Sequence, residues 1–220
     1  MEKKFENIVA RRFGYFNLYV IKGIDGDILI DTGFLFMKKR IKKWLDKFNV
    51  KLVILTHAHV DHIWNANYIK KLYGCKIAMS KVDNKNMDNW KIYSQPLKKR
   101  YVGWTKLMNF GMRMFNPEYL DVDIYLHDNQ IINKYGLELK VISLPGHTVG
   151  SIGILYKNYL FAGDSLVNRK KNPTTAYQNQ SNAAAIKTYN KIKKLDPDII
   201  FVGHDKEIVR INENKESLHK

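Results

Sequence analysis

The chain has 220 residues, 45% of them hydrophobic and 26% charged, a composition typical of a folded rather than a disordered protein. Its length favours one domain spanning residues 1–220, with room for an insertion. No apolar run approaches the roughly 18 residues of a membrane span. The N-terminal residues lack the apolar core of a secretory signal, and the single cysteine excludes an intrachain disulfide framework. We therefore expect a cytoplasmic protein without membrane association.

The net charge of +16 is high and is compatible with a nucleic acid, an anionic surface or an acidic substrate as partner. However, only seven of the 37 basic residues are arginines, and Lys, Asn, Ile and Tyr are all abundant. Because the codons of these four residues are AT-rich, a biased genome composition explains the charge without any basic binding function. We favour that explanation for the charge as a whole.

In the first part of the chain, strands are predicted to alternate with helices. An Asp25-Gly26 turn signal separates the first two strands. Apolar periodicity then predicts an amphipathic helix whose lysines form a solvated face. The expected elements are strands at about 16–22 and 27–31, a helix at 35–48, a strand at 51–55, a helix at about 62–72 closed by Gly74, and a strand at 75–79.

The second part begins with residues 81–118, which are basic and aromatic and show no strand periodicity. The pattern then returns to strands at 122–126, 137–144, 151–156 and 159–162. A helix at about 182–194, capped by Ser181 and ended by Asp196-Pro197, precedes a last strand at 198–202. Strands of both halves need one face covered by helices and the other buried, and two facing sheets with outer helices satisfy both needs.

The segment Thr56-His57-Ala58-His59-Val60-Asp61-His62 carries three histidines and an aspartate between a buried strand and a helix. Imidazole and carboxylate are good ligands for zinc and other borderline divalent metals. His57 and His59 project to the same side of an extended turn and can share one ion, while Asp61 and His62 can face a neighbouring ion. So dense a cluster at a strand end predicts a metal site.

Three further candidates repeat one local pattern, in which an apolar strand is followed by a glycine and then by a potential ligand. They are His147 after Gly146, Asp164 after Gly163 and His204 after Gly203. Glycine lets the backbone turn sharply and approach closely, which suits the delivery of a ligand from a strand end. His127 and His219 lack this pattern and are expected on the surface.

Five such motifs, in order from Asp31-Thr32-Gly33 to Gly203-His204, resemble those of the metallo-β-lactamase-fold hydrolases, with the motif set of glyoxalase II but without its C-terminal extension. The resemblance implies an α/β fold, a four-layer αβ/βα sandwich of two facing mixed sheets with outer helices. It also implies a dinuclear centre. The implied ligands are His57, His59 and His147 for the first ion, Asp61, His62 and His204 for the second, and Asp164 as a bridge, with Asp31 orienting ligands from behind.

The chemistry implied is that of two zinc ions, with iron or manganese as possible replacements. Such ions share a hydroxide and polarise a carbonyl or phosphoryl oxygen, so no Ser or Cys nucleophile is needed. Asp61 is the candidate catalytic residue, because its carboxylate can orient the hydroxide or protonate the leaving group. Cys75 is expected to be a small core residue.

Departures from other branches of the family narrow the activity. Asp164 stands where β-lactam-hydrolysing branches usually carry Cys or Ser, and His59 where flavodiiron oxygen reductases carry Glu. Homoserine-lactone lactonases carry Tyr at the position of Val167, and the chain continues too briefly after His204 for the glutathione-binding extension of glyoxalase II. What remains is a hydrolase of ester, thioester, lactone or phosphodiester bonds in a small, possibly anionic substrate.

Specificity is expected in residues 81–118, which have eight basic and three acidic residues with interleaved aromatics. This insertion is either a lid over the site or a helical pair packed on the sandwich. Its alternative function is to hold nucleic acid for a phosphodiesterase or nuclease-like reaction. The oligomeric state stays open. The candidate substrate-binding residues are Trp90, Trp104, Arg169, Lys170 and, as an oxyanion donor, Tyr177.

Overall fold

The computed structural model describes residues 2–88, 95–96, 102–103, 106, 110, 120–169 and 172–210. Its larger sheet has seven strands in the order β1-β2-β3-β4-β5-β6-β8. Neighbouring strands are antiparallel from β1 to β4 and parallel from β4 to β8. The strands are β1 (Glu2–Phe5), β2 (Ile8–Phe13), β3 (Phe16–Lys22), β4 (Asp27–Ile30), β5 (Val50–Ile54), β6 (Lys76–Ser80) and β8 (Ile124–Leu126).

The second sheet has six strands in the order β17-β16-β12-β11-β10-β9, and only the β12–β16 pair is parallel. These strands are β9 (Ile131–Lys134), β10 (Leu137–Ser143), β11 (Ile152–Tyr156), β12 (Tyr159–Gly163), β16 (Ile199–Val202) and β17 (Ile208–Val209). Two short antiparallel pairs complete the strands: β13 (Val167–Arg169) with β14 (Asn172–Thr174), and β7 (Gln95–Pro96) with β15 (Gln178–Asn179).

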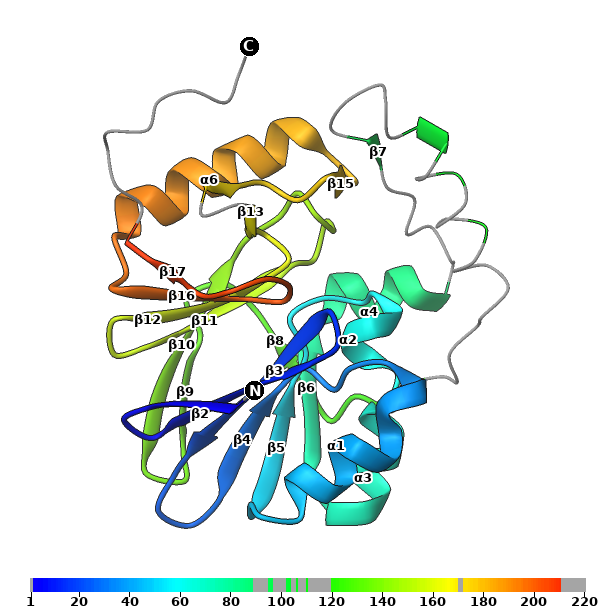
Figure 1. Ribbon diagram of the computed structural model, residues 1–220, viewed down its shortest axis with the longest axis vertical. Coiled ribbons are helices and arrows are strands. Elements are labelled where there is room, and N and C mark those ends of the chain that lie inside the picture. Colours follow the sequence, from blue (N-terminus) through cyan, green and yellow to red (C-terminus); the bar gives the residue numbers. More distant parts are fainter. Residues whose placement is uncertain are drawn as a thin grey trace.

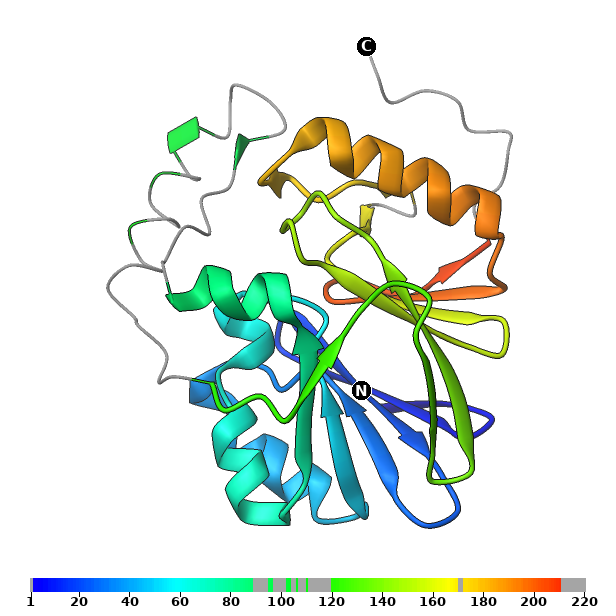
Figure 2. The same cartoon turned by 180° about the vertical axis from the view of Figure 1, so that it is seen from behind.

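Helices cover the outer faces of both sheets (Figures 1 and 2). The helices are η1 (Leu35–Met37), α1 (Lys38–Leu45), α2 (Val60–Ile63), α3 (Ala66–Tyr73), α4 (Lys81–Asp88) and α6 (Asn182–Leu195). Helix α1 is amphipathic and buries Ile41, Trp44 and Leu45 against the larger sheet. Helix α6 begins where Ser181 Oγ accepts a hydrogen bond from Ala184 N at 3.2 Å.

Three apolar clusters hold these layers together. The one between the sheets combines side chains such as Ile28 and Ile54 of the larger sheet with Phe161 and Phe201 of the smaller one, whose rings stack at 4.9 Å. The other two lie beneath the outer helices, one under α1 and α3 and one under α6. Helix, sheet, sheet and helix therefore form four layers, and the predicted αβ/βα sandwich of two mixed sheets is confirmed.

The structure departs from the predicted elements in several places, and strands such as β9, β13, β14 and β17 were not predicted. The N-terminal strands β1 and β2 were not anticipated, and the helix expected at 62–72 is divided into α2 and α3. Asn65 lies at this break with its side chain buried, and its Nδ2 donates to the carbonyl oxygens of Thr32, Gly33 and Phe34 at 3.0–3.1 Å. These hydrogen bonds attach the chain between α2 and α3 to the loop that follows β4.

The segment predicted as an insertion begins with helix α4, and most of its remainder, including Trp90 and Trp104, lies outside the described residues. Whether it forms a lid or a packed pair stays a prediction. In the part of the chain that the structure describes, no helix is both long enough and apolar enough to cross a membrane.

Candidate metal centre

The candidate ligands come from five segments that meet where strands of the two sheets end. The loop after β5 carries His57 and His59, and the short helix α2 that follows carries Asp61 and His62. From the second sheet, the segments that follow β10, β12 and β16 carry His147, Asp164 and His204, respectively. The structure brings all seven of these residues together.

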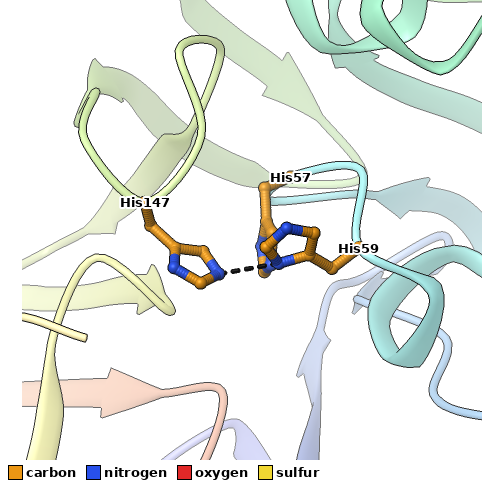
Figure 3. A group of neighbouring side chains, drawn as sticks. All are labelled: His57, His59 and His147. Carbon is orange, nitrogen blue, oxygen red and sulfur yellow. Dashed lines mark hydrogen bonds between the residues drawn. The ribbon is translucent and has the colours of Figure 1, made fainter. Parts of the chain in front are cut away.

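Their potential ligand atoms form three overlapping groups, each with atoms within 4.8 Å of one another: His57, His59 and His147; His57, His62 and Asp164; and Asp61, His62 and His204. In the first group, His147 faces His57 and His59 from the opposite loop (Figure 3), and its Nε2 lies 2.8 Å from His59 Nδ1. Each group can hold a metal ion.

Asp164 lies between the groups. Its Oδ2 is 3.5 Å from His147 Nε2 and 3.1 Å from His204 Nε2, and its Oδ1 is 3.5 Å from His62 Nε2. One carboxylate therefore reaches histidines of both halves of the site, which is the geometry a bridging ligand needs.

Several of these polar atoms are buried without a hydrogen-bond partner, namely His57 Nε2, His59 Nε2, His62 Nε2 and Asp164 Oδ1. Burying an unpaired polar atom costs roughly 1–3 kcal/mol, so a cluster of such atoms needs an explanation. Imidazole nitrogens and carboxylate oxygens that converge in this way are the ligands of borderline divalent cations. The residues present thus fit a metal centre.

The pKa values divide the histidines into two classes. Burial lowers the pKa of His57 and brings that of His59 to about 3, and neighbouring imidazoles add to both effects. Burial also acts to lower the pKa of His62 and His204, but nearby carboxylates outweigh it. Asp164 and Asp31 raise the pKa of His62 well above its usual range, and Asp164 and Asp61 raise that of His204 to about 12.

Asp31, which directly follows β4, holds Thr56 and His62 in place through its carboxylate. Its carboxylate accepts hydrogen bonds from Thr56 N at 2.8 Å, from Thr56 Oγ1 at 2.9 Å and from His62 Nδ1 at 2.8 Å. Because the Thr56 hydroxyl donates to Asp31, it accepts from His57 Nδ1, which is 3.0 Å away. Both imidazoles therefore keep Nε2 directed into the site.

Backbone carbonyls orient two other histidines. His147 Nδ1 donates to the Gln178 carbonyl at 2.7 Å, and His204 Nδ1 donates to the Tyr15 carbonyl at 2.9 Å. With Nδ1 bound to a carbonyl, each ring directs Nε2 into the site, where this nitrogen can bind a cation once it carries no proton.

The glycine pattern has a steric cause. A Cβ on Gly203 would lie 2.0 Å from Asp164 Oδ1 and 2.6 Å from His62 Cε1, and one on Gly163 would lie 2.5 Å from Thr56 Oγ1. Gly163 also has a φ of +52°. These glycines let the ends of β12 and β16 pass directly beside the ligands.

Sequence reasoning missed two residues of the site. The half-exposed Tyr15 stacks on His204, with centroids 5.5 Å apart and rings inclined by 11°, and burial together with the charges of Asp61 and Asp164 raises its pKa to about 12. Asp83 is buried in α4, and burial raises its pKa. Tyr15 is in the turn of an unpredicted hairpin, and Asp83 falls in the segment expected to be an insertion, so no motif marked either.

Of the five candidate substrate-binding residues, the structure describes Arg169 and Tyr177. The guanidinium of Arg169 lies 5.0 Å from the centre of the Tyr177 ring, and Tyr177 directly precedes Gln178, the partner of His147. Lys170, like the two tryptophans, lies outside the described residues. His127 is exposed as expected.

The Asp31 network predicts a large loss of stability for Asp31→Asn in the metal-free protein. Asparagine tolerates the positive φ of +60° at this position, but its amide group would face donors where a carboxylate accepted them. We expect the free energy of unfolding, measured with urea after chelator treatment, to fall by about 3 kcal/mol, the scale of breaking a buried ionic pair. Asp46→Asn, which alters an exposed pair with Lys42, should have a much smaller effect; equal effects would contradict this role.

The comparisons with known proteins agree with this geometry. The family model described as "Metallo-beta-lactamase superfamily" matches residues 11–204. The chain is 28% identical to hydroxyacylglutathione hydrolase GloC of Haemophilus influenzae, over 77% of this chain and 74% of the relative. It is 30% identical to a probable metallo-hydrolase of Methanocaldococcus jannaschii, over 70% and 69% of the two chains. It is 25% identical to the acyl-coenzyme A thioesterase MBLAC2 of Bos taurus, over 67% of this chain and 57% of the relative.

Solved structures show the same fold. A metallo-beta-lactamase family protein of Thermus thermophilus aligns with a TM-score of 0.70 at 18% identity, covering 93% of this chain and 75% of the other. The metallo-beta-lactamase GOB-18 of Elizabethkingia meningoseptica aligns with a TM-score of 0.67 at 22% identity, covering 90% and 74%. The chain therefore belongs to the metallo-β-lactamase superfamily, as its five motifs predicted.

Proposed function

We propose that this protein is a dinuclear metal-dependent hydrolase that cleaves a thioester or related ester bond in a small, anionic substrate. The observation that carries the proposal is the convergence of buried, unpartnered imidazole nitrogens of three histidines on Asp164, whose Oδ1 is also buried and unpartnered. Zinc is the metal this donor set favours, with iron or manganese as replacements.

In this proposal seven side chains would hold two ions, and the carboxylate of Asp164 would be available to both. When bound, the ions lower the pKa of water and polarise the substrate carbonyl. His57, His59 and His147 would hold the first ion, and Asp61, His62 and His204 would hold the second.

Two further roles in the reaction belong to Asp61, which is also a candidate ligand, and to Tyr15 beside the ligands. The pKa of Asp61 is about 2, because His62 and His204 outweigh the effect of burial, so this carboxylate is ionised at neutral pH. It can then orient the attacking water by accepting a hydrogen bond and afterwards hold a proton. Tyr15, with its pKa near 12, keeps its hydroxyl proton and can donate to the substrate from beside His204.

The substrate class rests on two supports. Hydroxyacylglutathione and acyl-coenzyme A, which appear in the names of two relatives, are both anionic acyl thioesters. Arg169 offers a cation next to Tyr177, the proposed oxyanion donor, which directly precedes the partner of His147 in the chain. A small anionic thioester matches both features.

A substrate panel tests this proposal. The zinc-loaded protein is assayed against aryl esters, acyl thioesters, lactones and bis-aryl phosphodiesters, and we expect thioesters to be turned over fastest. Preference for the phosphodiester, with oligonucleotide binding that weakens steeply as salt rises, would instead support the alternative of a nucleic-acid-acting enzyme. No turnover of any substrate would contradict the proposal.

Asp164→Ala tests the proposed bridge. The substitution should reduce hydrolysis by more than roughly 100-fold, because changes even to residues behind metal ligands commonly cost 10–100-fold. The matched control is Asp25→Ala, which removes an exposed carboxylate in the β3–β4 turn and should leave activity unchanged. Circular dichroism should show both variants folded. Full activity in Asp164→Ala would exclude it as a bridge.

The raised pKa values predict that metal loading releases protons. At pH 7 the metal-free protein holds His62 and His204 protonated, because nearby carboxylates raise the pKa of His62 well above its usual range and that of His204 to about 12, whereas a ligand needs a free Nε2 lone pair. Zinc titration calorimetry in two buffers of different ionisation enthalpy should therefore show release of about two protons per chain. His204→Ala should release about one proton fewer. Zinc binding without proton release would contradict the assigned second site.

A further inference from the structure

A buried carboxylate outside the candidate ligand set joins the two loops that carry the three-histidine group. Asp83 is the third residue of helix α4, and its side chain is only 1% exposed. An acid in the first turn of a helix commonly stabilises the helix dipole or caps its N–H groups. Here the carboxylate has another role, because its three hydrogen bonds within the described part of the chain go to residues of other segments.

The partners of Asp83 lie immediately beside the candidate ligands. Its Oδ2 accepts from Ala58 N at 2.9 Å, and Ala58 lies between His57 and His59. The same oxygen accepts from Thr148 Oγ1 at 2.7 Å, and Thr148 directly follows His147. Its Oδ1 accepts from Gly150 N at 2.8 Å. A single carboxylate thus bridges a loop of the larger sheet and a loop of the smaller sheet.

The fit between Asp83 and the second loop is close. A Cβ on Gly150 would lie 2.4 Å from Asp83 Oδ1 and 2.6 Å from its backbone nitrogen, so only glycine permits this approach. Thr148 Oγ1 is held further by Ser151 Oγ at 2.7 Å. One backbone hydrogen bond, from Ile152 N to Thr56 O at 2.9 Å, also joins the two loops, but its atoms are farther along the chain from His59 and His147.

From this geometry we infer that Asp83 is a positioning residue that sets the spacing of His57, His59 and His147 for the first metal ion. The inference rests on the metal centre proposed above. His147 must reach the other two histidines from a different sheet. The distance between the loops that follow β5 and β10 therefore decides whether the three nitrogens can share one ion. Asp83 contacts both loops within one residue of the histidines.

Asp83 and Asp31 support the site in different ways. Asp31 supports His62 directly and His57 through Thr56. Within the described residues, Asp83 hydrogen-bonds to the backbone and to Thr148 rather than to an imidazole. Removing the Asp83 carboxylate should therefore weaken the binding of the first ion more than that of the second.

The test measures zinc affinity by competition with a chromogenic chelator, in the wild-type chain and in Asp83→Asn. An amide cannot accept all three hydrogen bonds, so we expect the affinity of one of the two zinc ions to fall by roughly 10–100-fold and that of the other to change little. Cobalt substitution should also show an altered d–d spectrum. Asp123→Asn is the matched control, because Asp123 likewise accepts from a backbone N–H, that of Ile77 at 2.8 Å, away from the ligand loops.

Thr148→Val and Thr148→Ser keep the inference testable if Asp83→Asn does not fold. Valine removes the hydroxyl bonds of Thr148 to Asp83 and to Ser151 and should weaken zinc binding severalfold, whereas serine retains the hydroxyl and should restore it. Equal zinc affinity in wild type, Asp83→Asn and Thr148→Val, even with lowered thermal stability, would overturn the inference. A wild-type chain that binds no zinc would contradict the proposed function and this role together.

Discussion

The structure depends on imidazole and carboxylate side chains whose charges and lone pairs are crowded together where strands of the two sheets end. Four imidazoles and the carboxylate of Asp164 are packed within a few ångströms of one another and largely withdrawn from water. In the metal-free protein, protons on His62 and His204 balance the neighbouring carboxylates, while His57 and His59 stay neutral. Divalent cations at the proposed dinuclear centre would bind both classes of histidine, the first ion His57 and His59 and the second His62 and His204.

The sandwich supplies the rigidity that this arrangement needs. Each ligand follows the end of a strand or lies in the helix immediately after one, and the strands are fixed by the apolar clusters on both of their faces. Because Gly163 and Gly203 have no side chain, the ends of β12 and β16 can lie close to the candidate ligands. Asp31 and Asp83 then tie together loops that lie far apart in the sequence, so the site is positioned by side chains behind the ligands as well as by the ligands themselves.

Local signals in the sequence predicted most of the strands, the family and all seven residues that converge. The dense His57–His62 segment and the repeated glycine pattern were sufficient, because each ligand directly follows a strong strand signal. Other features depend on contacts between distant residues. Asn65 divides a predicted helix by binding a loop some 30 residues earlier, and Asp83 meets Thr148 across 65 residues. Tyr15 is placed by a hairpin whose first strand had no clear pattern.

The most direct test of the account is the number of metal ions that the folded chain binds. Native mass spectrometry of the chelator-treated protein during zinc titration should show two ions per chain at saturation. A reduced stoichiometry in His59→Ala and in His204→Ala would assign one ion to each half of the site. A folded wild-type chain that takes up no zinc, iron or manganese would contradict the proposed dinuclear centre and the hydrolytic function built on it.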